Sequence, residues 1–201
     1  MKALMVDVDG VVVRTPLGGW AANLEADLGI STAALQAQFF KPHWPDVVLG
    51  KADLHERLAP VLAEHAPHLT SHQLTAYWFE KDARLDEMLL TGLAALRLRG
   101  IQLHLATVQE HYRAAHLWTT LSLKDRFDAM HYSADLGAKK PDPAFYAAVE
   151  RKTGYAPGEL FLIDDTPANI EAARAAGWGA ALWDGTVDLF SLLDRRGAVG
   201  S

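Results

Sequence analysis

The chain has 201 residues, which is the length of one domain or of one domain that carries a modest insertion. Half of its residues are hydrophobic, so we expect a large buried core and exclude a disordered chain. The net charge of −6 without a basic block disfavours nucleic acid or an anionic membrane as partner, and the lack of cysteine excludes disulfides, thiolate catalysis and cysteine-based zinc sites.

The first apolar run is not typical of a targeting segment. Asp7 and Asp9 interrupt it too early for the core of a signal peptide. No other apolar stretch approaches the roughly 20 residues that a membrane-spanning helix needs. We therefore expect a soluble cytoplasmic protein without a membrane partner.

Short apolar runs recur along the chain and predict buried strands. The runs are nearly continuous rather than alternating, which is typical of strands covered on both faces of a sheet. In chain order they are Ala3–Val6, Ile101–Ala106, Ala129–Tyr132, Leu160–Ile163 and Ala180–Trp183.

The segments between these runs have helical spacing and recognisable ends. Gly100 can end the first of these helices, because glycine readily takes the left-handed conformation. Asp142 and Thr166, each followed by proline, are typical N-caps. The predicted helices are Asp86–Arg99, Ala144–Lys152, Ala168–Ala176 and a last one from a Thr186 cap through Leu193. Strands that alternate with helices predict right-handed crossovers and a mostly parallel sheet.

The segment from about Thr15 to Leu85 contains no run that predicts a buried strand. We interpret it as a helical insertion between the first strand and the Asp86 helix. Its expected helices cover roughly Leu17–Leu28, Thr32–Phe40, Asp53–His65 and His72–Glu80.

Polar residues stand where the predicted strands end. Asp7, Thr107 and Asp164 each end or follow a strand, and Lys140 follows the third strand after a short loop. Because ligands of open parallel sheets bind beyond the carboxyl ends of the strands, these residues are expected at one rim. Acids, a hydroxyl and an ammonium from separate segments at one rim predict a chemical site.

Four ordered motifs carry a resemblance to a known family. They are Asp7-Val8-Asp9-Gly10-Val11, Leu105-Ala106-Thr107, Lys139-Lys140-Pro141-Asp142-Pro143 and Ile163-Asp164-Asp165-Thr166. Together they resemble the motifs of the haloacid dehalogenase-like hydrolase superfamily. The resemblance covers the chain outside the insertion, which stands where C1-type caps stand in that family. It implies an α/β fold: a Rossmann-like, doubly wound, mostly parallel sheet in a core of residues 1–14 and 86–201, with a helical cap over residues 15–85.

The resemblance also implies a role for each catalytic residue. A carboxylate such as Asp7 can attack phosphorus and form an aspartyl-phosphate, which splits a hard displacement into two easier steps. Asp9 matches the family residue that protonates the leaving oxygen and then activates water. Thr107 would donate to the phosphoryl group, and Lys140 would hold both the phosphate and Asp7. The family often has Asn after the hydroxyl residue, whereas Val108 stands here, so a leaving-group contact commonly made there is absent.

Magnesium is the cofactor that the resemblance implies. Mg²⁺ prefers hard oxygen ligands in octahedral geometry. The implied ligand set is Asp7, the backbone carbonyl of Asp9, and the acidic pair Asp164 and Asp165. Family precedent favours Asp165 as a direct ligand and leaves Asp164 direct or bridged by water.

The predicted function is a Mg²⁺-dependent phosphatase that acts on a small phosphorylated metabolite. A sugar phosphate is the favoured substrate by analogy with glucose-1-phosphate phosphatases of the same branch. A 2-haloacid dehalogenase is an alternative, although it needs neither Mg²⁺ nor an acid like Asp9. A phosphate-binding member without catalysis is another alternative. Receiver domains use similar residues, but their acidic pair belongs to the first strand, whereas Asp164 and Asp165 come last. The chain is expected to be a monomer or homodimer.

Overall fold

Five parallel strands form the sheet at the centre of the core. The structure is a computed structural model that describes residues 1–194. The strands lie in the order β3-β2-β1-β4-β5, and every neighbouring pair is parallel. Their bounds are β1 Ala3–Val6, β2 Gln102–Thr107, β3 Ala129–Tyr132, β4 Leu160–Asp164 and β5 Gly179–Leu182. The predicted α/β class, the parallel sheet and the five strand positions are therefore confirmed, with ends that differ by at most one residue.

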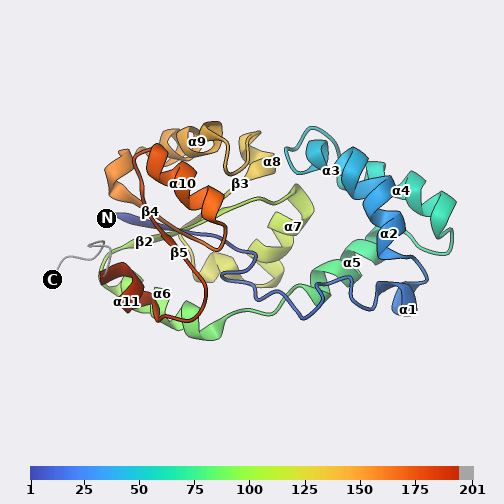
Figure 1. Cartoon of the computed structure of the whole chain (residues 1–201), viewed down its shortest axis with the longest axis horizontal. Helices are drawn as coiled ribbons and strands as arrows, with labels where there is room; N and C mark the ends of the chain where they lie inside the picture. Colours follow the sequence, from blue (N-terminus) through green and yellow to red (C-terminus); the bar gives the residue numbers. More distant parts are fainter. Residues whose placement is uncertain (195–201) are drawn as a thin grey trace.

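Helices cover both faces of this sheet, as Figure 1 shows. On one face Leu4 and Val6 of β1 pack with the apolar side chains of α6 and α11. On the other face Ala3 and Met5 pack with those of α9 and α10. Burial on both sides explains why the strands are continuous apolar runs. The helices of the core are α6 Glu87–Leu98, α7 His111–Ala115, α8 Ser133–Leu136, α9 Pro143–Thr153, α10 Pro167–Ala175 and α11 Leu189–Asp194, with the short turns η2 His116–Thr120, η3 Leu123–Asp125 and η4 Pro157–Glu159.

The insertion after β1 is helical, as predicted, and has a hydrophobic cluster of its own. That cluster includes Leu24, Phe39, Leu58 and Leu74, and it draws no residue from the sheet. In Figure 1 these helices lie to one side of the sheet, at the right of the view. Their bounds are α1 Leu24–Leu28, α2 Thr32–Leu35, the π-helical turn η1 Gln36–Phe40, α3 Lys41–Val47, α4 Leu54–His65 and α5 Ser71–Lys81.

Two helix boundaries in the insertion differ from the prediction. The helix predicted from Leu17 begins only at Leu24, because Gly18 and Gly19 take positive φ values in a turn. The helix predicted to stop at Phe40 continues to Val47, because Pro42 follows the π-helical turn Gln36–Phe40, where the regular helical hydrogen-bond pattern is already interrupted.

Of the predicted N-caps, Thr186 is wrong, and Thr166 stands at the N-cap position of α10 without a side-chain cap hydrogen bond. The backbone N–H and hydroxyl of Thr186 both donate to Asp184 in a turn, and the last helix begins three residues later at Leu189. The hydroxyl of Thr166 makes no cap hydrogen bond, because it donates to Asp165.

The two linkers between core and insertion lie side by side. Val13 and Leu85 form an antiparallel bridge, and the Arg14 guanidinium pairs with the Asp86 carboxylate at 2.8 Å. We propose on this basis the division into a core of residues 1–14 and 86–201 and a cap of residues 15–85. Residues 195–201 of that core lie outside the described residues. Within residues 1–194, no helix has the length and apolar character that crossing a membrane requires.

Candidate active site

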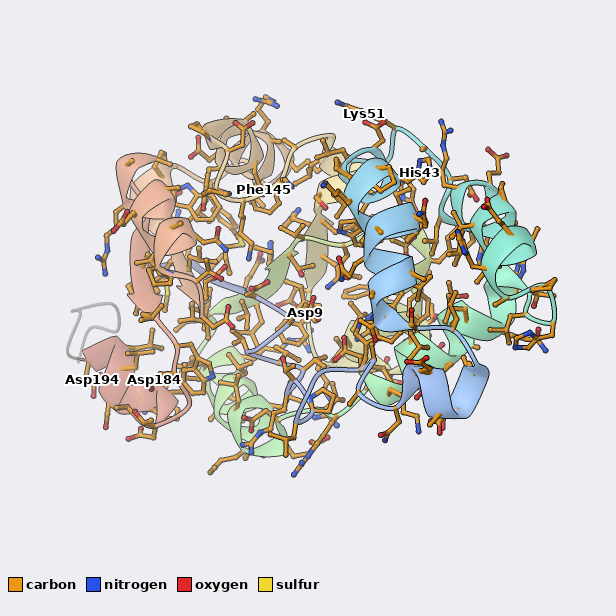
Figure 2. The ribbon with its side chains drawn as sticks, turned by 45° about the vertical axis from the view of Figure 1, so that its right-hand side comes forward. Asp9, His43, Lys51, Phe145, Asp184 and Asp194 are labelled. Carbon is orange, nitrogen blue, oxygen red and sulfur yellow. The ribbon has the colours of Figure 1, made fainter. Side chains whose placement is uncertain are left out.

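A pocket of about 300 Å³ opens where β1, β2 and β4 end. These three strands are neighbours in the sheet, so Asp7, Thr107 and Asp164 reach the same rim. Figure 2 shows Asp9 at this place, between the core and the helices of the insertion. The pocket is lined by Asp7, Asp9, Gly10, Thr15, Thr107, Val108, Lys140, Asp165, Thr166 and Asn169. The structure thus brings five of the six predicted site residues to one pocket, and the sixth, Asp164, is fully buried beside Lys140.

Asp7 follows β1 directly and is held on the sheet, where its N–H donates to the Ile163 carbonyl at 3.0 Å. One carboxylate oxygen, Oδ1, accepts from the Val8 N–H at 2.8 Å and lies 2.9 Å from the Lys140 ammonium. Burial raises the pKa of Asp7 to about 7, the nearby Asp164 adds to the rise, and Lys140 opposes it. Asp7 is therefore a buried carboxylate whose oxygen is oriented by two donors.

Lys140 stands between two acids. Its side chain is 1% exposed, and its Nζ lies 2.9 Å from Asp7 and 2.5 Å from Asp164. Burial alone would lower the pKa of Lys140, but the charges of Asp7 and Asp164 and the hydrogen bonds to them raise it. Lys140 therefore stays charged and partly neutralises the acids around it.

Donors surround the carboxylate of Asp164. Oδ1 accepts from the Thr166 N–H at 2.9 Å and from the Asn169 amide at 2.9 Å. Oδ2 accepts from the Lys140 ammonium and from the same amide at 3.0 Å. Both oxygens of this buried carboxylate are therefore already engaged by the protein.

Carboxylate oxygens of Asp7, Asp164 and Asp165 lie within 4.8 Å of one another. Asp165 is exposed, and its Oδ1 accepts from the Thr166 hydroxyl at 3.1 Å. Space for its other oxygen depends on Gly10, since a Cβ on Gly10 would lie 2.0 Å from Asp165 Oδ2. Gly10 also has a φ of +79°, which glycine adopts without strain. Hard oxygen donors gathered this closely fit a Mg²⁺ ion, because a divalent cation would offset their mutual repulsion.

Asp9 is exposed in the pocket, and its side chain is not part of that acidic trio. Its Oδ2 accepts a hydrogen bond of 2.7 Å from the side-chain amide of Gln109. The surrounding protein desolvates the Asp9 carboxyl and so raises its pKa. The charge of Arg113 and the hydrogen bond from Gln109 oppose this rise. Asp7 and Asp9 therefore stand in different surroundings, one beside a lysine and the other beside an amide.

Arg113 of α7 joins the core to the insertion. Its side chain is 1% exposed, and its guanidinium donates to the Phe79 carbonyl at 3.2 Å and to the Asp82 carbonyl. The Asp82 carboxylate lies 3.6 Å away. Phe79 is in α5 and Asp82 is its C-cap, so Arg113 binds the end of the helix that leads back to the core.

Three of these residues were missed or left open by the sequence analysis. Gln109 stands two residues after Thr107, and that spacing past a strand end was a usable signal. A polar residue in the helix after Asp165 fits either a contact behind the site or the helix surface, and Asn169 is buried against Asp164. Arg113 gave no signal, because no local pattern indicates that an arginine will be buried.

Comparisons with known proteins agree with this geometry. A family model of haloacid dehalogenase-like hydrolases matches residues 1–177. A phosphorylated carbohydrates phosphatase from Thermotoga maritima is 25% identical in an alignment of 187 positions that covers 88% of this chain and 82% of the relative. A phosphoglycolate phosphatase from Thiobacillus denitrificans is 26% identical in an alignment of 192 positions that covers 88% of this chain and 80% of the relative.

Solved structures show the same fold. A haloacid dehalogenase family enzyme from Bacteroides thetaiotaomicron, in complex with magnesium and inorganic phosphate, superposes with a TM-score of 0.80 at 19% identity, covering 96% of this chain and 98% of the other. A HAD-like family hydrolase from Porphyromonas gingivalis superposes with a TM-score of 0.78 at 17% identity, covering 100% of this chain and 99% of the other. At this identity the likeness establishes the fold alone.

The chain belongs to the haloacid dehalogenase-like hydrolase family. Its relatives over most of its length are phosphatases, and the predicted enzyme class, a phosphatase of this family, is confirmed. The roles of the individual site residues stay predictions.

Proposed function

We propose that this chain is a Mg²⁺-dependent phosphatase that hydrolyses a small phosphomonoester through an aspartyl-phosphate on Asp7. The observation that carries the proposal is the Asp7 carboxylate, which lines the pocket within 2.9 Å of the Lys140 ammonium and among three clustered acids. A nucleophile, a fixed cation and hard oxygen ligands at one point are what phosphoryl transfer requires.

In the first step an oxygen of Asp7 attacks phosphorus and forms a new O–P bond. The bond from phosphorus to the leaving alcohol breaks, and its electron pair stays on the leaving oxygen. Asp9, in its protonated form, gives its proton to that oxygen, so the alcohol leaves as a neutral molecule.

In the second step Asp9 acts as a base. It takes a proton from a water molecule, whose oxygen attacks the phosphorus of the aspartyl-phosphate. The bond between phosphorus and Asp7 breaks, which restores the carboxylate and releases inorganic phosphate. Asp9 is then protonated again, ready for the next substrate.

Thr107 and Lys140 bind the transferring group in this proposal. Thr107 is 1% exposed at the end of β2 and lines the pocket, so its hydroxyl is a fixed donor. The Lys140 ammonium lies beside Asp7, where negative charge collects on the phosphoryl oxygens. Donors that are in place before the reaction stabilise that charge without reorganisation.

The acidic residues around Asp7 would hold the magnesium ion. Asp7, Asp165 and the backbone carbonyl of Asp9 would be direct ligands, because both oxygens of Asp164 are engaged by other donors. Asp164 would then act through water or by orienting Lys140. When bound, the ion would neutralise charge on the phosphoryl oxygens and orient the group for in-line attack.

The favoured substrate class is a small phosphorylated metabolite, with a sugar phosphate first. A pocket of about 300 Å³ suits a small molecule rather than a polymer. The relatives support the same class, since one is named for phosphorylated carbohydrates and another for phosphoglycolate. The cap over residues 15–85 would close over the bound substrate and exclude bulk water.

A panel of phosphomonoesters and 2-haloacids, assayed with Mg²⁺ and with a chelator, tests the proposal. We expect metal-dependent release of phosphate, which Asp7→Asn abolishes. Mass spectrometry of acid-quenched enzyme should locate the phosphoryl group on Asp7. Asp135→Asn is the matched control, because Asp135 is exposed and pairs with Lys152 at the surface. Release of halide without metal would instead establish the dehalogenase, and the absence of both activities would favour a phosphate-binding role.

A further inference from the structure

The Asp9 carboxylate receives its hydrogen bond from a residue of a distant segment. Gln109 lies 100 positions along the chain, in the loop between β2 and α7, and its Nε2 is 2.7 Å from Asp9 Oδ2. The same nitrogen lies 3.4 Å from the hydroxyl of Thr107. The amide therefore bridges two residues that line the pocket.

Gln109 is itself held firmly. Its side chain and backbone are 3% exposed as a whole, and its carbonyl accepts from the Ala134 N–H at 3.2 Å and from the Ser133 hydroxyl at 3.0 Å. Ser133 is fully buried, and its hydroxyl shares its one proton between this carbonyl and the nearer Val48 carbonyl of the cap, at 2.6 Å. A residue fixed in this way at its backbone presents its amide in a defined place.

The Asp9 backbone is held by a bridge to Val13, but its carboxylate depends on its own contacts in the pocket. Asp9 is exposed in the pocket and precedes the turn at Gly10, so its side chain has room for more than one rotamer. Proton transfer to a leaving oxygen needs hydrogen-bond reach, and a misplacement of about 1 Å can cost about 100-fold in rate. A buried amide that donates to Oδ2 would favour the productive rotamer of Asp9 and leave Oδ1 free for the substrate.

We propose that Gln109 is a positioning residue for the proton transfers of Asp9. The amide suits both forms of the acid, because Nε2 can donate to Oδ2 of the carboxylate and equally to Oδ2 of the carboxylic acid whose proton is on Oδ1. This role rests on the proposed function, in which Asp9 serves first as acid and then as base.

The experiment compares two leaving groups. p-Nitrophenolate leaves without a proton, whereas the alcohol of an alkyl phosphate such as glucose 6-phosphate needs one. Because kcat/KM covers the steps up to formation of the aspartyl-phosphate, Gln109→Leu should lower kcat/KM for the alkyl phosphate by about 10- to 100-fold. It should lower kcat/KM for p-nitrophenyl phosphate by less than about threefold, and inhibition by inorganic phosphate should stay unchanged.

A double-mutant cycle with Asp9→Asn separates positioning from a structural effect. If Gln109 acts through Asp9, adding Gln109→Leu to Asp9→Asn produces no further loss for the alkyl phosphate. Gln102→Leu is the control, since Gln102 is exposed at the other end of β2 and contacts His104 and Tyr155. Gln109→Glu, which keeps the shape and replaces the donor by a repelling carboxylate, serves if Gln109→Leu does not fold, and it should show the same selectivity.

Equal losses for both leaving groups, or losses that add to those of Asp9→Asn, would overturn the positioning role and leave the proposed function standing. A wild-type enzyme that releases phosphate from no member of the phosphomonoester panel would remove the proposed function itself and this role with it.

Discussion

Replacing Lys140 with methionine removes a buried charge and keeps most of the length of the side chain. The ammonium lies between Asp7 and Asp164 at 2.9 and 2.5 Å, and its removal leaves two buried acids without their cation. Removing one partner of a buried ion pair lowers the free energy of unfolding by about 3–5 kcal/mol. Asp164 keeps its donors from Thr166 and Asn169, and Asp7 keeps the Val8 N–H, so we expect the lower end, about 3 kcal/mol.

For a chain of this size each kcal/mol shifts Tm by about 2–4 °C, so Lys140→Met should lower Tm by about 6–12 °C. Differential scanning calorimetry in a chelating buffer measures the shift. Lys139→Met is the matched control, because Lys139 is exposed and should leave Tm within about 1 °C. Equal Tm values for the two variants would refute the view that Lys140 balances the buried acids. Added Mg²⁺ should restore part of the Tm that Lys140→Met loses, whereas Lys139→Met has no such loss to restore.

Three further predictions follow from single residues. Gly10→Ala would bring a Cβ to 2.0 Å from Asp165 Oδ2 at a φ of +79°. The affinity for Mg²⁺, measured by titration calorimetry, should therefore fall at least about 10-fold. An unchanged affinity would exclude Asp165 as a ligand. Burial, together with the nearby His104, lowers the pKa of His131 from 6.5 to about 4. Between these pH values the unfolded chain binds a proton that the folded chain does not. The free energy of unfolding should therefore fall by up to about 3 kcal/mol from pH 6.5 to pH 4. His131→Leu should flatten that part of the profile in urea titrations, and an unchanged slope would contradict the assignment. Gly50→Ala would place a Cβ 2.4 Å from the Ala134 carbonyl at a φ of +70°, so the cap should separate from the core and the radius of gyration in solution scattering should rise; identical scattering curves would count against this contact.

Local patterns in the sequence predicted the core well. The five strands were recognisable because burial on both faces makes them continuous apolar runs, and parallel neighbours bring their ends to one rim. Asp7, Thr107 and Asp164 were therefore placed correctly from their positions at strand ends. The helix caps were less certain, because a threonine such as Thr186 can equally bond a neighbouring aspartate in a turn.

The insertion was predicted as helical, but two of its helix ends were placed wrongly. Proline is a helix breaker in a sequence pattern, yet the helix continues past Pro42, because a π-helical turn has already interrupted the regular hydrogen-bond pattern just before it. Whether a proline begins or breaks a helix depends on where the preceding turn ends. In this chain a π-helical turn, Gln36–Phe40, sets that point.

The sequence by itself determined the fold class, the family resemblance and six site residues, five of which line the pocket while Asp164 is buried beside it, because these depend on local spacing and on the ends of parallel strands. Only the tertiary structure decided which donors those residues meet. Three hydrogen bonds join segments that no local pattern relates. Asn169 donates to Asp164, Gln109 donates to Asp9, and Arg113 donates to the Phe79 carbonyl in α5. Such contacts depend on how helices pack on the sheet and on the cap, and packing is a property of the whole chain.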